Sequence, residues 1–183
     1  PLKRVMSLVP ASRQTLLLSA TLSKEIIAAA RAFTKDPVRI DVAPEHVVAS
    51  TVVHRVFAVP QEHKRDLLAH VLTTGPSRQT LVFCRTKHGS DRVGRFLTGA
   101  GLRTAVIHGD KNQGARKRAL ADFKAGHVSV LVATDVAARG LDIEKLPLVV
   151  NFDLPLVAQD SIHRVGRTGR AGQTGEAISL ATT

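Results

Sequence analysis

Short apolar runs alternate with polar or helix-like stretches along this chain, and that alternation constrains the fold more than any other feature. The runs are Thr80–Cys84, Thr104–Ile107, Val128–Ala133, Leu148–Phe152 and Ala177–Leu180. Several are apolar at consecutive positions, as central strands of a parallel sheet must be, because both faces of such strands are covered. We therefore expect an α/β domain with a mostly parallel central sheet and helices on both faces.

Three segments between these runs have apolar residues at helical spacing, namely Glu62–Leu72, Lys87–Ala100 and Asn112–Ala125. Asn112 is a typical N-cap residue, and Gly126 is a typical residue for the end of the helix that Asn112 begins.

Upstream of this domain the pattern indicates a separate small unit. Thr15–Ala20 and Val38–Ile40 are predicted to be strands, and Ser23–Phe33 is predicted to be a helix with Ser23 as its cap. The chain begins at Pro1 rather than at Met, as expected of a product cut from a longer protein. We expect three parts: the tail of a preceding domain (residues 1–42), a linker (residues 43–50) and the α/β domain (residues 51–183).

The composition is that of a globular protein. Hydrophobic residues make up 44% of the chain, no apolar run approaches the roughly 20 residues of a membrane span, and there is no signal-peptide pattern. Cys84, the one cysteine, lies in an apolar run and is expected to be a buried thiol. Because one cysteine cannot form an internal disulfide, the chain is compatible with a reducing cytoplasm, where we expect it to reside.

The charge indicates a polyanionic partner. Lys and Arg number 26 against 15 Asp and Glu, which gives a formal net charge of +11. A basic surface that is merely solvated explains this equally well, but basic groups that neutralise phosphates gain from counterion release. The chain has no Trp, no Tyr and only six Phe, so stacking on bases is a poor explanation and the nucleic-acid backbone is the expected target.

Polar segments follow several of the predicted strands, and ligands gather at the carboxyl ends of parallel strands. These segments are Arg85-Thr86-Lys87, His108-Gly109-Asp110, Thr134-Asp135 and the residues after Phe152. A helix start after Thr86 suits a phosphate, although an N-cap role explains Thr86 more simply.

The helix predicted to follow Asn112 begins with basic residues. Gln113 and Arg116 share one of its faces, and a bound anion would offset the unfavourable position of Arg116–Arg118 near the positive end of the helix dipole. The glycine spacing of Gly109–Gly114 imitates a P-loop, but Ala115-Arg116 stands where a P-loop needs Lys and Ser or Thr. We therefore exclude a Walker A site here.

Two segments near the end of the chain concentrate polar groups. Residues 134–142 contain Thr134, Asp135, Arg139, Gly140 and Asp142. An isolated Asp and Arg would form a structural ion pair, but this density at a strand end indicates a site. His163–Arg170 (HRVGRTGR) holds three arginines and two glycines in eight residues. Guanidinium groups suit phosphate oxygens and stabilise charge in phosphoryl transfer, whereas the alternative is a basic surface loop.

Five segments in order carry a family resemblance: Ser19-Ala20-Thr21, LVFCRTKHG, IHGDKNQGARKRALADF, VLVATDVAARGLDI and HRVGRTGRAGQTG. They resemble motifs III, IV, IVa, V and VI of the DEAD-box RNA helicases, and RTKHG with HGDKNQGARKRALADF resembles the bacterial RhlE-type branch. The resemblance covers nearly the whole chain. His163 is part of it, because DEAH-type and many DNA helicases carry Gln at this position of the motif.

The resemblance implies a RecA-like three-layer α/β/α domain that is the carboxyl-terminal half of an ATP-dependent motor. Arg167 and Arg170 would reach the γ-phosphate of ATP, with Arg170 as the main arginine finger. Asp142 would contact the ribose, with Gly140 beside it in the nucleotide site. Arg139 and His163 would link to the motifs of the opposing domain.

The remaining implied roles concern RNA and coupling. Contacts to the RNA sugar–phosphate backbone, with little sequence preference, are implied for Arg85, Thr86, Gly109, Gln113, Arg116 and Thr134. Coupling of ATP hydrolysis to strand separation is implied for Ser19, Ala20 and Thr21, together with His163.

The chain departs from the family pattern because it has no G-x-x-x-x-G-K-[ST] and no adjacent Asp-Glu pair. The resemblance implies that ATP with Mg²⁺ is held mainly by an amino-terminal RecA-like domain, and no metal ligand is expected in this chain. We expect the chain alone to lack RNA-stimulated ATPase activity.

Other interpretations stay open from the sequence. One is a stand-alone RNA-binding or annealing module without ATP chemistry. A DNA translocase is disfavoured by His163 and by Ser19-Ala20-Thr21. The predicted strand Thr15–Ala20 lacks a sheet, so it would be disordered, fold back or pair with a second copy in a homodimer.

Overall fold

The computed structural model describes residues 2–19, 24–40, 52–75, 78–143, 145–169 and 174–182. The chain divides into two compact units, Pro1–Val47 and Val48–Thr183. The predicted linker at residues 43–50 lies outside the described residues.

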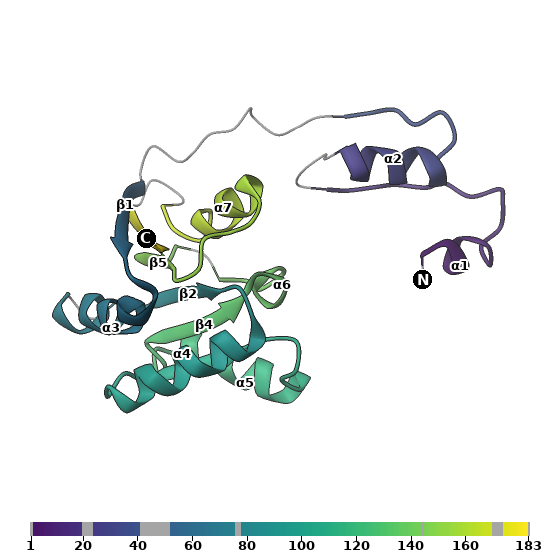
Figure 1. Ribbon diagram of the computed structural model, residues 1–183. Coiled ribbons are helices and arrows are strands. Elements are labelled where there is room, and N and C mark those ends of the chain that lie inside the picture. Colours follow the sequence, from purple (N-terminus) through teal and green to yellow (C-terminus); the bar gives the residue numbers. More distant parts are fainter. Residues whose placement is uncertain are drawn as a thin grey trace. The chain divides into compact units, whose positions relative to one another are not determined.

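The second unit is built on a six-stranded sheet in which every pair of neighbouring strands is parallel (Figure 1). The strands are β1 (Val52–Val59), β2 (Thr80–Cys84), β3 (Thr104–Ile107), β4 (Val130–Thr134), β5 (Leu148–Asn151) and β6 (Gly175–Thr182). Their order across the sheet is β1-β6-β5-β2-β4-β3. All the strands therefore end at one edge, which is where the polar segments were predicted to meet.

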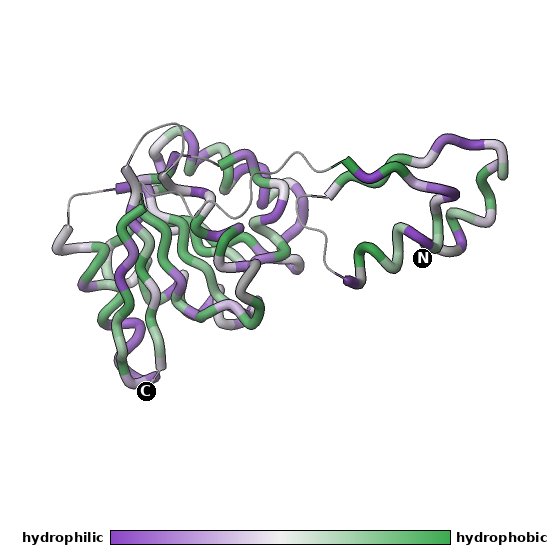
Figure 2. The backbone as a smooth tube through the Cα atoms, turned by 90° about the horizontal axis from the view of Figure 1, so that it is seen from above, coloured by the Kyte–Doolittle hydropathy of each residue, from purple (hydrophilic) through white to green (hydrophobic). Residues whose placement is uncertain are grey.

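The helices form a layer on each face of the sheet. They are η1 (Gln61–His63), α3 (Lys64–Thr74), α4 (Lys87–Gly99), α5 (Gln113–Lys124), α6 (Asp135–Ala138) and α7 (Ala158–Val165). Alternate residues of β2 point to opposite faces, so Val82 packs in one core with Leu68 of α3 and Leu97 of α4, whereas Leu81 packs in the other with Phe123 of α5. The predicted three-layer α/β/α fold is confirmed, and Figure 2 shows the central strands as mostly hydrophobic.

Several element boundaries differ from the prediction for local reasons. The strand predicted at Val128–Ala133 begins two residues later, because the Val128 amide bonds to the carbonyl of Asp122 in the turn after α5. The helix predicted at Glu62–Leu72 begins as a short 3-10 turn and continues as α3. Asn112 caps α5 as predicted, since its side chain accepts a hydrogen bond from the Ala115 amide at 2.8 Å.

The strand β1 was missed by the sequence analysis. It pairs with β6 along its whole length, at one end of the sheet. Its polar residues His54 and Arg55 are exposed, so its sequence lacks the unbroken apolar run that marks the central strands.

The first unit contains α1 (Leu2–Met6) and α2 (Lys24–Phe33). The strands predicted at Thr15–Ala20 and Val38–Ile40 are contradicted over their described residues, which form no strand. The physical reason is that a strand requires a neighbouring strand for its backbone hydrogen bonds, and the described part of this unit offers none. Leu16 and Leu18 are accordingly exposed.

The thiol of Cys84 is predicted to be inert in the native protein. Cys84 is fully buried in the core, and burial raises the pKa of its thiol to about 12. A raised pKa keeps the thiol protonated at neutral pH, and the thiolate is the reactive form. A thiol-specific reagent should therefore modify Cys84 only as fast as the protein unfolds. Rapid modification at neutral pH under native conditions would contradict this packing.

Candidate functional site

The buried guanidinium of Arg164 organises the carboxyl edge of the sheet. It donates to both carboxylate oxygens of Asp135, with the Nε and Nη2 bonds at 2.6 and 2.8 Å. Its Nη1 donates to the Asn151 side chain at 3.0 Å and to the Asp153 carbonyl at 2.6 Å. The charge also lies 5.0 Å from the centroid of the Phe83 ring. Only 2% of Arg164 is exposed, so α7 is tied to the ends of β2, β4 and β5 through one side chain.

Sequence reasoning singled out HRVGRTGR but gave Arg164 no role of its own. A signal was present, because Asp135 and Asn151 are polar residues at or just beyond the ends of apolar strands, where a buried polar group requires a partner. The identity of that partner depends on the tertiary structure.

Exposed charges surround this buried pair. Arg139, which follows α6, donates to the Asp160 carboxylate of α7 at 2.7 Å. The Nδ1 atom of His163 lies 4.0 Å from the same carboxylate. Arg139 and His163, two residues for which the family resemblance implied a shared role, thus lie beside the same carboxylate, and both are exposed at this edge.

Arg167 faces the loop after α6. Its Nη1 donates to the Leu141 carbonyl at 2.7 Å and to the Ile143 carbonyl at 3.4 Å, and its Nη2 donates to the Ala138 carbonyl at 3.4 Å. These bonds fix the loop that carries Gly140 and Asp142. Gly140 has a φ of +74°, a conformation that favours glycine.

The carboxylate of Asp142 points into solvent, with 89% of its side chain exposed. The ammonium of Lys124 donates to it at 2.7 Å and lowers the pKa of Asp142. An ionised carboxylate is an acceptor for hydroxyl groups, which is the chemistry that a ribose contact needs.

The predicted backbone-binding residues lie along the ends of β2, β3 and β4. Thr86 caps α4 through a hydrogen bond from the Gly89 amide at 2.9 Å, so its simpler N-cap role is confirmed. Gln113 and Arg116 share one face of α5 and bond to each other at 3.3 Å. Thr134 ends β4 and is 8% exposed.

A second network holds the loop after β3. His108 is 3% exposed, and its Nδ1 accepts from the Asp110 amide at 3.3 Å. Its Nε2 therefore carries the proton and donates to Asp91 at 3.0 Å. Lys111 also binds Asp91, at 2.9 Å, and lowers the pKa of that carboxyl, as His108 does to a lesser degree. The network positions Gly109, where an added Cβ would come within 3.3 Å of the Lys87 side chain.

Some predicted site residues fall elsewhere. Ala20, Thr21 and Arg170 lie outside the described residues. Ser19 is described and exposed, but it belongs to the first unit, so it is not placed relative to the edge. Over the described ranges, no helix is long and apolar enough to cross a membrane, and no three His, Cys, Asp or Glu residues gather as metal ligands would.

Residues 63–172 match the model of the helicase conserved carboxyl-terminal domain. Among curated proteins, the chain is 40% identical over 185 residues to the ATP-dependent RNA helicase DBP2 of Debaryomyces hansenii, an alignment that covers 99% of this chain and 34% of that protein. The chain spans only about a third of the length of such relatives.

Solved structures give the same result. The Escherichia coli DEAD-box protein SrmB, bound to regulator of ribonuclease activity A, is 41% identical with a TM-score of 0.65, over 70% of this chain and 76% of that one. Saccharomyces cerevisiae Dbp5, bound to RNA and ADP BeF3, is 30% identical with a TM-score of 0.85, over 98% of this chain and 48% of that one.

Proposed function

Because this chain belongs to the DEAD-box RNA helicases through its carboxyl-terminal helicase domain, we propose that it is the second motor domain of an ATP-dependent RNA helicase. In this role it binds the RNA backbone and supplies arginines to an ATP that an amino-terminal RecA-like domain holds with Mg²⁺. Residues 1–42 would then be the tail of that first domain, residues 43–50 the linker and residues 51–183 the second domain.

One observation carries the proposal. The buried pair of Arg164 and Asp135 anchors α7 at the carboxyl edge of the sheet, where Asp160 of α7 binds Arg139. Both of these guanidinium groups are paired with carboxylates, so their role is to position α7 and Arg167, the arginine that follows it, for a reaction that develops negative charge.

The nucleotide-facing roles follow from this edge. Asp142 would accept hydrogen bonds from the ribose hydroxyls in place of the one it accepts from Lys124. Gly140 would lie beside it in the nucleotide site. Arg139 and His163 would contact the first domain and its Ser19-Ala20-Thr21 segment. Arg167 and Arg170 would face the γ-phosphate. In the free domain Arg167 donates to three carbonyls, so reaching a phosphate requires it to exchange those bonds.

Sequencing the parent gene upstream of Pro1 tests the proposal directly. We expect a P-loop with its lysine and an Asp-Glu-Ala-Asp box, because this chain supplies neither. A parent without either motif would favour the alternative, an RNA-binding or annealing module without ATP chemistry. If both motifs are present, comparing the unwinding of RNA and DNA duplexes by the full protein separates an RNA helicase from a DNA translocase.

RNA binding by the chain is predicted to depend steeply on salt. The proposed contacts are Arg85, Thr86, Gly109, Gln113, Arg116 and Thr134, and they face phosphates and sugars rather than bases. Each neutralised phosphate of single-stranded RNA contributes about −0.7 to the slope of log affinity against log salt. Titrations of several unrelated sequences over a range of salt should give parallel steep lines. An affinity that is independent of salt but differs between RNA sequences would contradict backbone binding.

Three finer assignments belong to the same proposal. The segments RTKHG and HGDKNQGARKRALADF support a place in the RhlE-type branch. The single cysteine, Cys84, forms no internal disulfide and is therefore compatible with the cytoplasmic residence that we propose. The first unit, whose Leu16 and Leu18 are exposed, would pair with a second copy in the absence of its own domain.

A further inference from the structure

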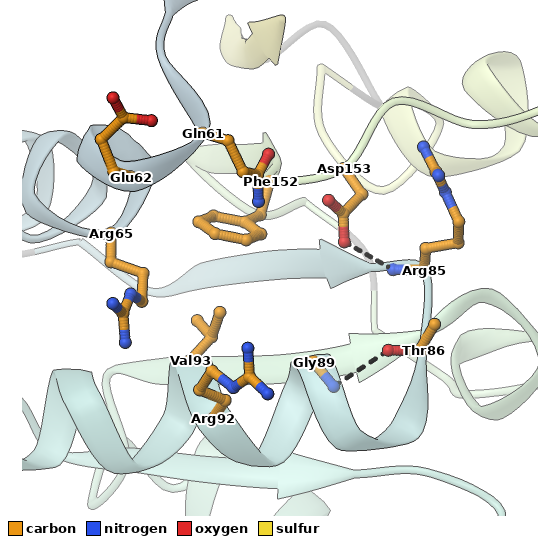
Figure 3. Close-up of a pocket in the computed structure, with 10 residues that line it drawn as sticks. All are labelled: Gln61, Glu62, Arg65, Arg85, Thr86, Gly89, Arg92, Val93, Phe152 and Asp153. Atoms are coloured by element: carbon orange, nitrogen blue, oxygen red, sulfur yellow. Dashed lines mark hydrogen bonds between the residues drawn. The ribbon is translucent and has the colours of Figure 1, made fainter. Parts of the chain in front are cut away.

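A pocket of about 410 Å³ opens at the carboxyl edge of the sheet, on the side of α4 that faces α3 (Figure 3). It is lined by Gln61, Glu62, Arg65, Arg85, Thr86, Gly89, Arg92, Val93, Phe152 and Asp153. Pockets of this volume hold groups the size of a nucleotide. Two of the lining residues, Arg85 and Thr86, already belong to the proposed RNA contacts, whereas Arg65 and Arg92 have no assigned role.

The carboxylate of Asp153, which lines this pocket, is already engaged. Asp153 accepts from the Arg85 backbone amide at 2.9 Å through Oδ2, and its Oδ1 lies 3.6 Å from the buried ammonium of Lys64. Lys64 in turn sits 4.8 Å from the centroid of the Phe152 ring. Asp153 is therefore neutralised from within the protein, and the exposed Glu62 is the other carboxylate in the lining.

Two guanidinium groups meet no carboxylate in this pocket. Arg65 of α3 lies over the Phe96 ring, with its guanidinium carbon 5.3 Å from the centroid. The side chain of Arg92 in α4 is exposed and makes no hydrogen bond or ion pair with any residue in the described parts of the chain. Figure 3 shows Arg65 extending from α3 toward α4, where Arg92 lies. Two guanidinium groups that line one pocket, neither of them in an ion pair with Glu62 or Asp153, can bind a phosphate group.

The pocket continues the proposed RNA path. On one side of Thr86, Lys87 adjoins Gly109 of the β3 loop. Thr86 itself and the preceding residue, Arg85, line the pocket. An RNA strand that runs over the ends of β3 and β2 would thus place its next phosphate in the pocket.

The geometry points to a further phosphate subsite, in which Arg65 and Arg92 hold one more backbone phosphate of single-stranded RNA beyond the contact at Thr86. This inference rests on the proposed function, because it extends the same RNA path.

The test measures the affinity of the chain for oligouridylates of increasing length. Arg92→Gln is expected to weaken the binding of long oligonucleotides about five- to tenfold at low salt. It should also make the slope of log affinity against log salt less steep by about 0.7. Oligonucleotides too short to extend from Thr86 into the pocket should bind the wild type and Arg92→Gln with equal affinity. Arg65→Gln should repeat this pattern, and Arg103→Gln, which removes the same charge at the start of β3, should not.

Because Arg92 is exposed, an unchanged thermal midpoint is expected for Arg92→Gln and separates lost binding from misfolding. Equal affinity of the wild type and Arg92→Gln at every length would overturn the subsite while leaving the proposed function intact. A chain that binds no RNA of any length would overturn both. If Arg92→Gln abolishes binding of an aspartate-rich peptide but leaves RNA affinity unchanged, the pocket serves a protein partner and the inference is wrong.

Discussion

Replacing Arg164 with alanine is expected to lower the free energy of unfolding by about 3 to 5 kcal/mol, the cost of removing one partner from a buried ion pair. The substitution leaves the Asp135 carboxylate without its two donors and the Asn151 side chain and Asp153 carbonyl without theirs. These groups lie between the sheet and α7, so water replaces the guanidinium only in part. Urea unfolding followed by circular dichroism measures the change.

A matched substitution and a double-mutant cycle make this prediction specific. Arg95→Ala removes an exposed arginine from α4 and should change stability by less than about 0.5 kcal/mol. Asp135→Ala alone should also destabilise strongly, because it strands the buried guanidinium. The double variant should lose much less than the sum of the two, since neither charge remains unpaired. Additive losses would contradict a coupled pair.

This network also marks the limit of prediction from sequence. The strands β2, β4 and β5 were predictable because continuous apolar runs identify the centre of a covered parallel sheet. The meeting of polar residues at one edge followed from strand direction alone. The pairing of Arg164 with Asp135 did not, because the two residues are 29 positions apart and several arginines in the same segment have equal chemistry.

In the first unit, by contrast, the sequence predicted a strand that the structure does not contain over the described residues. The apolar sequence of Thr15–Ala20 has strand propensity, but the described residues form no strand because propensity cannot supply a hydrogen-bonding neighbour. The meeting of three arginines in one pocket could likewise not be predicted from the sequence. Arg65 and Arg92 belong to different helices, which come together only in the tertiary structure.

The purified chain is expected to show no RNA-stimulated ATPase activity, whereas the parent protein with its first domain should be active. In that parent, Arg170→Ala is expected to lower kcat by about 10³-fold or more, the usual contribution of an arginine that stabilises a transferring phosphoryl group. Arg170→Lys should recover little, because an ammonium lacks the planar fork of a guanidinium. Initial rates of phosphate release at saturating ATP and RNA measure both variants.

Arg103→Gln, at the opposite edge of the sheet from the proposed site, is the control and should keep the parent rate. Arg167→Ala separates two roles that the free domain leaves coupled. If Arg167 only fixes the loop through the carbonyls of Ala138, Leu141 and Ile143, the substitution should raise KM for ATP more than it lowers kcat. If it reaches the phosphate, kcat should fall and KM should change little. Substantial turnover by the chain alone, abolished by Arg170→Ala, would show that this domain holds a complete ATP site and would overturn the division of labour proposed for the two domains.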